Sequence, residues 1–231
     1  LVGYQDDIQK VLRKQNKGLS ARGKLLLQIS IALIPAIYMV ILGKTTVSVF
    51  DWFNINLGIL YPLFAVFVIV GSSNAVNLTD GLDGLASGTA LVSFVALTII
   101  MAILGHTDLA IISAALAGSC AGFLYFNKYP AKIFMGDTGS LALGGVLGAL
   151  AVVAKIELWL LLIGIIYICE TLSVILQVIS FKTTGKRIFK MSPIHHHFEL
   201  SGWHETRVVA LFVIIQVLFS AAAVALWKFV S

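Results

Sequence analysis

The chain alternates between long apolar runs and short polar segments. A helix needs about 20 mostly apolar residues to cross the ~30 Å hydrocarbon core of a membrane, and seven runs approach or reach that length. Each should be a helix, because lipid offers no hydrogen-bond partner to free backbone groups. The predicted spans are Leu25–Gly43, Gly58–Gly71 and a little beyond, Gly84–Gly105, Leu109–Phe126, Leu141–Ala154 with its flanks, Leu158–Phe181 and Val208–Trp227.

The composition excludes a water-soluble globule. Apolar residues make up 59% of the chain and charged residues 12%, about half the ~25% of a soluble domain. The mean hydropathy is +0.98. Short alternating segments typical of a membrane β-barrel are absent from the sequence. We therefore predict an all-α integral membrane protein, a polytopic helix bundle that forms a single transmembrane domain over residues 1–231.

The charges orient the spans. When successive loops are assigned to alternate sides, thirteen of the sixteen Lys and Arg residues fall on one side, which is therefore predicted to be cytoplasmic. The chain then starts inside and ends outside. The net charge of +5 is explained by this orientation and by anionic ligands, so we expect no nucleic acid partner. In the outer loop Lys44–Leu57, apolar residues at alternate positions predict a short β-hairpin, although an irregular interfacial loop has the same pattern.

Five aspartates fall on the predicted cytoplasmic side. Asp6 and Asp7 lie in GYQDDIQKVLRK, where a helix would bring Lys10 within one turn of both and Lys14 one turn further. Such a segment is either a solvated, salt-bridged helix end or a site for a divalent cation or a phosphate. The pattern alone does not separate these two interpretations.

The segment NAVNLTDGLDGLASG is more specific. Asn74, Asn77, Asp80 and Asp83 recur at every third residue, so a continuous helix would gather them on one face. The alternative is that Thr79 or Asp80 caps the next span. A cap needs only one such residue, and we therefore favour a functional face.

The segment FMGDTGSLALGG places Asp137 where a Gly-rich span begins. Oxygen ligands beside a helix N-terminus suit Mg²⁺ that carries phosphates, but an N-cap would use the same residue. Phe134 is either an interfacial residue or an aromatic face for a base. The four glycines of this span, Gly139, Gly144, Gly145 and Gly148, predict close packing between helices.

The last cytoplasmic loop contains His195, His196 and His197. Three consecutive histidines cannot all reach one ion from a regular helix, so a zinc site is disfavoured. They can donate hydrogen bonds to phosphate oxygens. Glu170 is the only acid well inside a span, which makes it a functional candidate or a partner of a neighbouring helix.

Together, GYQDDIQKVL, NLTDGLDGLASG, FMGDTGSLALGG and SPIHHHFELSGWHETRVV resemble the polyprenyl-phosphate N-acetylhexosamine-1-phosphate transferases, and SPIHHHFE resembles their muramoyl-pentapeptide branch. The resemblance runs from Val2 to the C-terminus. Members of the family have ten spans, which implies that about three N-terminal helices are missing from this chain. It also implies a multi-pass protein of the bacterial inner membrane with its active site on the cytoplasmic face, and a homodimer is the assembly to test.

The resemblance implies transfer of phospho-MurNAc-pentapeptide from UDP-MurNAc-pentapeptide to undecaprenyl phosphate, which yields lipid I and UMP and uses Mg²⁺. Direct attack, in which Asp6 orients or deprotonates the acceptor, is preferred to a covalent aspartyl intermediate. The resemblance further implies a role for each matching residue: Asp137 as the Mg²⁺ ligand; Asp6, Asp7, Asp80 and Lys10 around the reaction; Asn77, Asp83, Phe134 and Gln177 at the nucleotide; and Lys14, His196 and His197 at phosphates.

Two other functions are kept as alternatives. A sibling enzyme that transfers GlcNAc-1-phosphate from UDP-GlcNAc would have similar aspartates, but the loop of three histidines argues against it. An ion-coupled transporter would place its binding groups near mid-membrane, whereas here the acids follow one membrane surface.

Overall fold

The computed structural model describes residues 1–13, 18–50 and 52–230. The chain divides into two compact units. Unit 1 comprises residues 1–77, 135–160 and 227–231, and unit 2 comprises residues 78–134 and 161–226. A single membrane domain that lacks about three helices stays a prediction.

Seven helices among the described residues are long and apolar enough to cross a membrane, which confirms the predicted number and order. They are α2 (Ala21–Ile41), α3 (Tyr61–Thr79) with the short 3-10 helix η1 (Gly58–Leu60) before it, α4 (Leu85–Ile103), α5 (Thr107–Asn127), α6 (Gly136–Ala154), α8 (Ile165–Thr184) and α10 (Glu205–Val230). The chain is therefore a multi-pass, all-α membrane protein.

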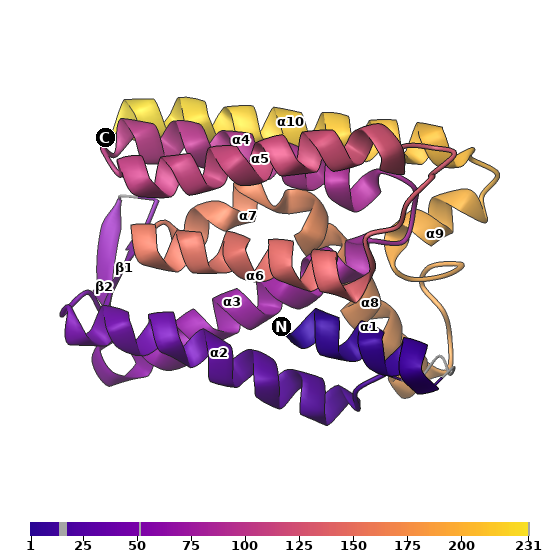
Figure 1. The fold of residues 1–231 in the computed structure, drawn as a ribbon, viewed down its shortest axis with the longest axis horizontal. Coiled ribbons are helices and arrows are strands. Elements are labelled where there is room, and N and C mark those ends of the chain that lie inside the picture. Colours follow the sequence, from indigo (N-terminus) through magenta and orange to yellow (C-terminus); the bar gives the residue numbers. More distant parts are fainter. Residues whose placement is uncertain (14–17, 51, 231) are drawn as a thin grey trace. The chain divides into compact units, whose positions relative to one another are not determined.

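Unit 1 is built around α2, α3 and α6, and the amphipathic helix α1 (Val2–Arg13) packs on α6 and α2. Figure 1 shows α1 beside the start of α6. The core of the unit joins small residues of α2 to larger ones of α3, among them Ala36, Tyr61 and Ile69. A hairpin of β1 (Thr46–Val49) and β2 (Phe53–Asn56) follows α2, with Val47 opposite Ile55. The predicted β-hairpin is thus confirmed.

The α3–α6 contact depends on two glycines. A Cβ on Gly144 would overlap the backbone carbonyl oxygen of Ser72, and one on Gly148 would lie 2.8 Å from the Cα of Ile69. The two helices therefore touch backbone to backbone, which a small residue at every fourth position permits. The close packing predicted from the glycines of this span is confirmed at these two positions.

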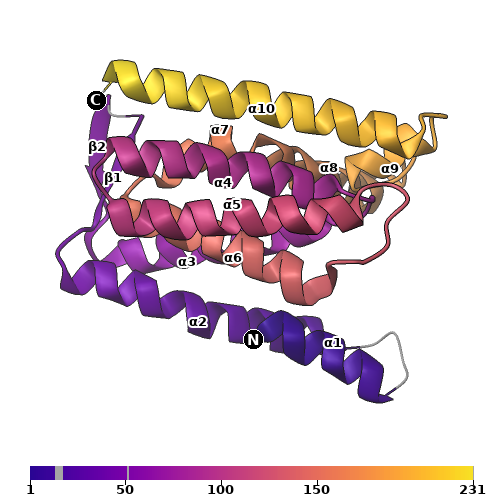
Figure 2. The same cartoon turned by 45° about the horizontal axis from the view of Figure 1, so that its top comes forward.

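Unit 2 contains α4, α5, α7 (Leu160–Ile163), α8, the six-residue helix α9 (Ile194–Glu199) and most of α10. The helices α4 and α5 form an antiparallel pair along their whole length (Figure 2). The core of the unit joins Leu85 of α4 and Ile166 of α8 to Val208 and Phe212 of α10. This core packs α4 and α8 against the N-terminal part of α10, which begins at Glu205.

The sixth predicted span is not one helix. It breaks at Gly164, between α7 and α8, so the expectation of a continuous helix over Leu158–Phe181 was wrong. The buried amide of Gln216 in α10 serves the freed backbone groups. Its Nε2 donates to the carbonyl oxygen of Ile163, and its Oε1 accepts from the N–H of Ile166 at 3.3 Å. Ser93 of α4 also donates to Ile163, at 2.7 Å. A polar residue on a third helix makes the break tolerable inside a membrane.

Replacing Gln216 with Leu should destabilise unit 2, because the Ile166 N–H would lose the Gln216 side chain as an acceptor and the carbonyl of Ile163 would lose one donor. Interhelical hydrogen bonds in membranes contribute about 0.6 kcal/mol on average and up to about 1.7, so we expect a loss of about 1–2 kcal/mol. Thermal unfolding in detergent measures the change, with Gln216→Glu as a partial rescue because it keeps the acceptor. An unchanged midpoint for Gln216→Leu would contradict this role.

Candidate active site

Three of the five predicted aspartates meet in unit 1. Asp6 and Asp7 lie on α1, and Asp137 lies in the first turn of α6. Each offers one carboxylate oxygen, and these oxygens lie within 4.8 Å of one another. Asp6 is buried, with 1% of its surface exposed. We call Asp6, Asp7 and Asp137 the carboxylate cluster.

Two lysines reach into the carboxylate cluster. The Nζ of Lys10 lies 2.6 Å from Asp6 Oδ2, 3.3 Å from Asp7 Oδ1 and 3.4 Å from Asp137 Oδ2. Burial alone would lower the pKa of Lys10, but the adjacent carboxylates of Asp6, Asp137 and Asp7 outweigh it and raise the pKa, so this lysine stays charged. The Nζ of Lys24 lies 2.5 Å from Asp137 Oδ2 and 3.4 Å from Asp6 Oδ2.

Lys24 was not among the predicted site residues. In the sequence it is one of several cations before the first span, and 113 positions separate it from Asp137. Its position at the start of a span on the predicted cytoplasmic side was the only available signal, because spans that begin on the same surface bring their first residues to a similar depth.

Polar neighbours hold each carboxylate of the cluster. The N–H and the Oγ1 of Thr138 donate to Asp7 Oδ2 at 2.8 and 2.6 Å. The N–H of Leu19 donates to Asp6 Oδ1 at 2.8 Å. Asn77, predicted to contact the nucleotide, donates to Asp137 Oδ1 at 3.0 Å. The N-cap position of α6 is Met135, so Asp137 is not the cap, although a carboxylate in the first turn favours the helix dipole.

Acid should weaken the attachment of α1 to α6. Burial would raise the pKa of Asp7, but hydrogen bonds from Thr138 and Lys10 outweigh it and lower the pKa. A carboxyl whose pKa is lowered by folding stabilises the fold above its unfolded pKa, and this contribution is lost as pH falls through the folded value. We expect the thermal midpoint of unfolding to decrease once the pH falls below about 4. The decrease should be smaller in Thr138→Val. Parallel profiles for the two proteins would contradict the assignment.

The cluster fits a divalent cation. Mg²⁺ prefers carboxylate oxygens together with water and phosphate oxygens, in near-octahedral geometry at about 2.0–2.1 Å. Oxygens on neighbouring corners of such an octahedron lie about 3 Å apart and those on opposite corners about 4 Å, which the spacing within the cluster allows. The formal charge of the three carboxylates and the two ammonium groups together is −1. The cluster can therefore hold a divalent cation together with anionic phosphates.

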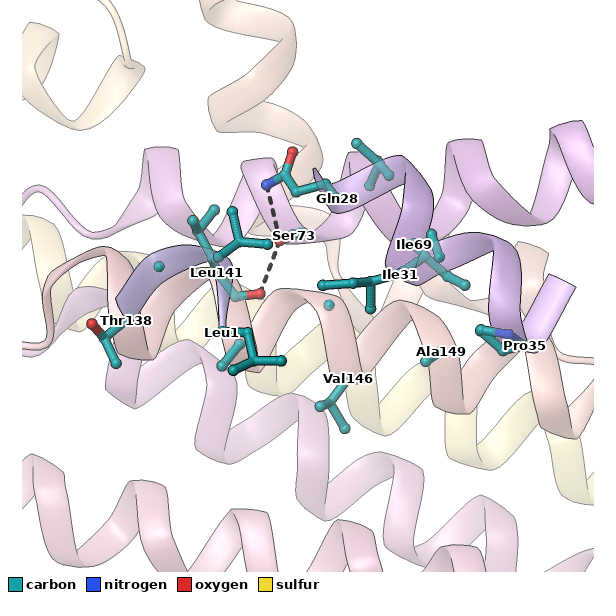
Figure 3. Close-up of a pocket in the computed structure, with 16 residues that line it drawn as sticks. Leu1, Gln28, Ile31, Pro35, Ile69, Ser73, Thr138, Leu141, Val146 and Ala149 are labelled. Atoms are coloured by element: carbon teal, nitrogen blue, oxygen red, sulfur yellow. Dashed lines mark hydrogen bonds between the residues drawn. The ribbon is translucent and has the colours of Figure 1, made fainter. Parts of the chain in front are cut away.

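An apolar cavity of about 260 Å³ lies beside the cluster in unit 1. Thr138 is at one end of it, and Ile31, Pro35, Val146 and Ala149 are among its apolar lining residues (Figure 3). Its other polar side chains bond within the protein: Gln28 donates to Ser73, and Ser73 donates to the carbonyl oxygen of Leu141 at 2.9 Å. The chemistry of the lining suits an apolar group rather than a nucleotide.

The other two aspartates belong to the turn between α3 and α4 in unit 2. Helix α3 ends at Thr79 and α4 begins after Gly84, so the prediction that Asn74, Asn77, Asp80 and Asp83 share one helix face was wrong, and so was the alternative cap at Thr79 or Asp80. Glycines at 81 and 84 favour a turn over a continuous helix.

Asp83 is fixed at both its backbone and its side chain. Its N–H donates to Glu205 Oε1 at 2.6 Å, and its Oδ2 accepts from the N–H of Ala131 at 2.8 Å. Asn127 supports the same region, because its Oδ1 accepts from Gly84 N–H and from Ser87, and its Nδ2 donates to the carbonyl oxygen of Ile133. Glu205 and Asn127 were not predicted, since neither has a local sequence pattern that separates it from other polar residues at helix ends.

Phe134, Gln177, His196 and His197, which were predicted to contact the nucleotide or phosphates, also lie in unit 2. Phe134 is exposed, at 77%, and its ring is available for stacking. Gln177 accepts from the N–H groups of Ile188 and Phe189 and donates to the carbonyl oxygen of Phe189, so its amide organises the loop after α8. Lys14 lies outside the described residues.

The three histidines differ in their surroundings. His196 pairs with Glu199 at 2.7 Å, and the Nδ1 of His197 accepts from the N–H of Lys190 at 3.1 Å; both rings are half-buried. His195 is fully buried, and its Nδ1 lies 3.0 Å from Oε1 of the equally buried Glu170. Glu170 thus partners a residue of α9, which matches the interpretation of this acid as a hydrogen-bond partner between helices.

Comparison with known proteins places these residues in a wider context. The family model described as glycosyl transferase family 4 matches residues 1–155. Over 226 residues the chain is 53% identical to the phospho-N-acetylmuramoyl-pentapeptide-transferase of Desulforamulus reducens. The alignment covers 95% of this chain and 67% of that protein. The chain is 50% identical over 222 residues to the protein of the same name from Anoxybacillus flavithermus, with 95% of this chain and 68% of that protein covered. The chain therefore spans about two thirds of the length of these relatives.

Proposed function

Because the chain belongs to glycosyl transferase family 4, and within it to the phospho-N-acetylmuramoyl-pentapeptide transferases, we propose that it transfers phospho-MurNAc-pentapeptide from UDP-MurNAc-pentapeptide to undecaprenyl phosphate. An oxygen of the lipid phosphate attacks the sugar-linked phosphorus of the donor. The bond from that phosphorus to the oxygen shared with the uridine-linked phosphate breaks. UMP leaves, and lipid I remains in the membrane.

The observation that carries this proposal is the carboxylate cluster with its two lysines. Phosphoryl transfer requires several anionic groups to approach one another, so catalysis rests on positioning and on neutralising charge. Lys10 and Lys24 would meet the phosphates of donor and acceptor. Asp137 would hold Mg²⁺ beside Asp6 and Asp7, and when bound this ion would neutralise charge on the phosphate oxygens.

The acceptor needs little help to become a nucleophile. A phosphate monoester has a second pKa of about 6, so the lipid phosphate is mostly dianionic at pH 7. We therefore propose direct attack, with Asp6 orienting the acceptor or taking its remaining proton, over an aspartyl intermediate. The deep burial of Asp6 and its hydrogen bond from Leu19 agree with an orienting role, since they hold this carboxylate in one direction.

The residues predicted to contact nucleotide and phosphate would bind the donor. We propose that Phe134 stacks on the uracil ring while Asp83, Gln177 and Asn77 fix the uridine directly or through the backbone that they hold. Lys14, His196 and His197 would contact phosphates, and Asp80 would act close to the reaction. We propose that these events occur at the cytoplasmic face of the bacterial inner membrane, which the thirteen cations on one predicted surface support. A homodimer stays a prediction.

Release of UMP tests the proposal. The full-length protein in detergent would be given undecaprenyl phosphate and UDP-MurNAc-pentapeptide, with Mg²⁺ or with a chelator. We expect UMP and a lipid-linked product only when both substrates and Mg²⁺ are present. No release from any UDP-sugar by a well-folded sample would contradict the proposal, and release without metal would contradict the role of Mg²⁺.

A panel of donors separates the sibling activity. UDP-GlcNAc would replace UDP-MurNAc-pentapeptide under the same conditions. Turnover of UDP-GlcNAc in preference to the muramoyl donor would assign the chain to GlcNAc-1-phosphate transfer. The relatives named above, which share about half of the residues, favour the muramoyl donor.

A further inference from the structure

A buried acid–histidine pair in unit 2 is not used by the reaction proposed above. Glu170 of α8 and His195 of α9 are both fully buried, and Glu170 Oε1 lies 3.0 Å from His195 Nδ1. This separation is that of a hydrogen bond between the carboxyl group and the imidazole ring. This bond fixes the direction of the ring because both partners are enclosed.

The far edge of the His195 ring faces the turn that carries Asp80 and Asp83. A Cβ built on Gly81 would overlap His195 Nε2 and lie 2.8 Å from Cε1. Gly81 is not at a positive backbone φ, so the backbone conformation does not require glycine there. The imidazole ring does, because it occupies the space of a side chain.

The same ring contacts His196. The centroids of the His195 and His196 rings lie 4.1 Å apart, and the Nδ1 of His196 lies 2.7 Å from Glu199 Oε2. His195 therefore touches both the turn with the two aspartates and the histidine predicted to meet phosphate. Helix α9 has only six residues and cannot hold such a geometry by its own helical hydrogen bonds.

Stability alone does not account for this pair. Replacing both partners of a buried hydrogen bond by apolar side chains of the same shape is often nearly neutral or stabilising, so an apolar pair would serve a simple core. A directional hydrogen bond, in contrast, fixes the position of a ring.

We propose that Glu170 and His195 are positioning residues that hold the Asp80–Asp83 turn and His196 at a fixed spacing for the uridine diphosphate part of the donor. This inference rests on the proposed function. Glu170 orients the ring, the ring sets the place of Gly81, and the turn presents its carboxylates accordingly. Neither residue needs to touch the substrate.

Binding of UMP to the full-length protein, measured by titration calorimetry, tests the proposal together with the KM for UDP-MurNAc-pentapeptide. Gly81→Ala pushes a methyl group against the ring and should weaken UMP binding at least about tenfold, with KM rising in parallel. Gly122→Ala in α5 is the matched control, since a Cβ there meets no atom within 4 Å, and it should bind UMP as the unmodified protein does.

A double-variant cycle identifies the ring as the cause. In a His195→Ala background the methyl group of Gly81→Ala has room, so the double variant should bind UMP no more weakly than His195→Ala alone. Glu170→Gln keeps an acceptor for Nδ1 and should stay within about threefold of the unmodified affinity, whereas Glu170→Ala should lose about tenfold. A purely structural role would lower the thermal midpoints of these variants without this pattern of rescue.

The outcomes separate the two proposals. Normal UMP binding by Gly81→Ala, or an effect of equal size with and without His195, would overturn the positioning role while leaving the transferase activity in place. An unmodified protein that releases no UMP would contradict the proposed function instead. If Gly81→Ala fails to fold, the comparison of Glu170→Gln with Glu170→Ala decides, and equal losses in both would overturn the positioning role.

Discussion

Replacing Asp137 with Asn is expected to reduce the rate of UMP release at least about 100-fold. The substitution removes one of the three carboxylates that lie within 4.8 Å of one another and leaves Lys24 without the charge that faces it at 2.5 Å. Loss of a metal ligand or of preorganised charge at a phosphoryl-transfer site costs about 10²–10³ in rate. Steady-state UMP release over a range of Mg²⁺ concentrations measures the loss.

Asp108→Asn is the matched control for Asp137→Asn. Asp108 is likewise an acid in the first turn of a span, but it is exposed and begins α5, at the end predicted to face outward. We expect its activity to equal that of the unmodified protein. The fold of Asp137→Asn should survive, because an asparagine oxygen can still accept from Asn77. Activity of Asp137→Asn within about threefold of the unmodified protein would remove Asp137 from the catalytic machinery.

Replacing Gly144 with Ala is expected to destabilise unit 1 by about 3 kcal/mol and to lower the thermal midpoint by about 6–12 °C. The added methyl group would overlap the backbone of Ser72 and lie 2.7 Å from the Cα of Ser73, and backbone atoms cannot rotate away as a side chain can. Activity should fall as well, because Asn77 on α3 holds Asp137 on α6 and a shift between these helices would separate them.

The neighbouring glycine provides the control for Gly144. A Cβ on Gly145 would meet Ser73 at 3.8 Å, an ordinary van der Waals contact, so Gly145→Ala should unfold within about 1 °C of the unmodified protein. The two substitutions add the same methyl group to adjacent positions of one helix. Equal midpoints for them would show that the contact between the α3 and α6 backbones does not limit stability.

The sequence predicted the spans well because membrane insertion depends on composition over about twenty residues. It did not predict the break at Gly164, because a glycine in an apolar run is common in spans and the break depends on Gln216, more than fifty positions away. The outer hairpin was predictable from alternation, since its strands pair locally. The second span was predicted to end a little beyond Gly71, but α3 continues to Thr79, because Ser72, Ser73 and Asn74 are polar yet helical.

The site was predictable in part. All five aspartates were predicted to lie on one membrane surface, and the structure brings three of them, Asp6, Asp7 and Asp137, together. Lys24, Asn127 and Glu205 were missed because their roles depend on which helices become neighbours, which no local pattern records. For Asn77 the sequence indicated a functional residue, but only the packing of α3 on α6 shows that it holds Asp137.

The amide of Gln216 also sets the position, along the axis of α8, of the loop that follows this helix. Since one side chain serves both sides of the break, α8 cannot slide along α10 without losing both contacts. Gln177 follows Gly164 by thirteen residues, about 20 Å along the helix axis, so the loop that Gln177 organises begins at a set height. One residue inserted between these two positions would raise that height by about 1.5 Å and turn Gln177 through about 100°, away from the backbone that it holds.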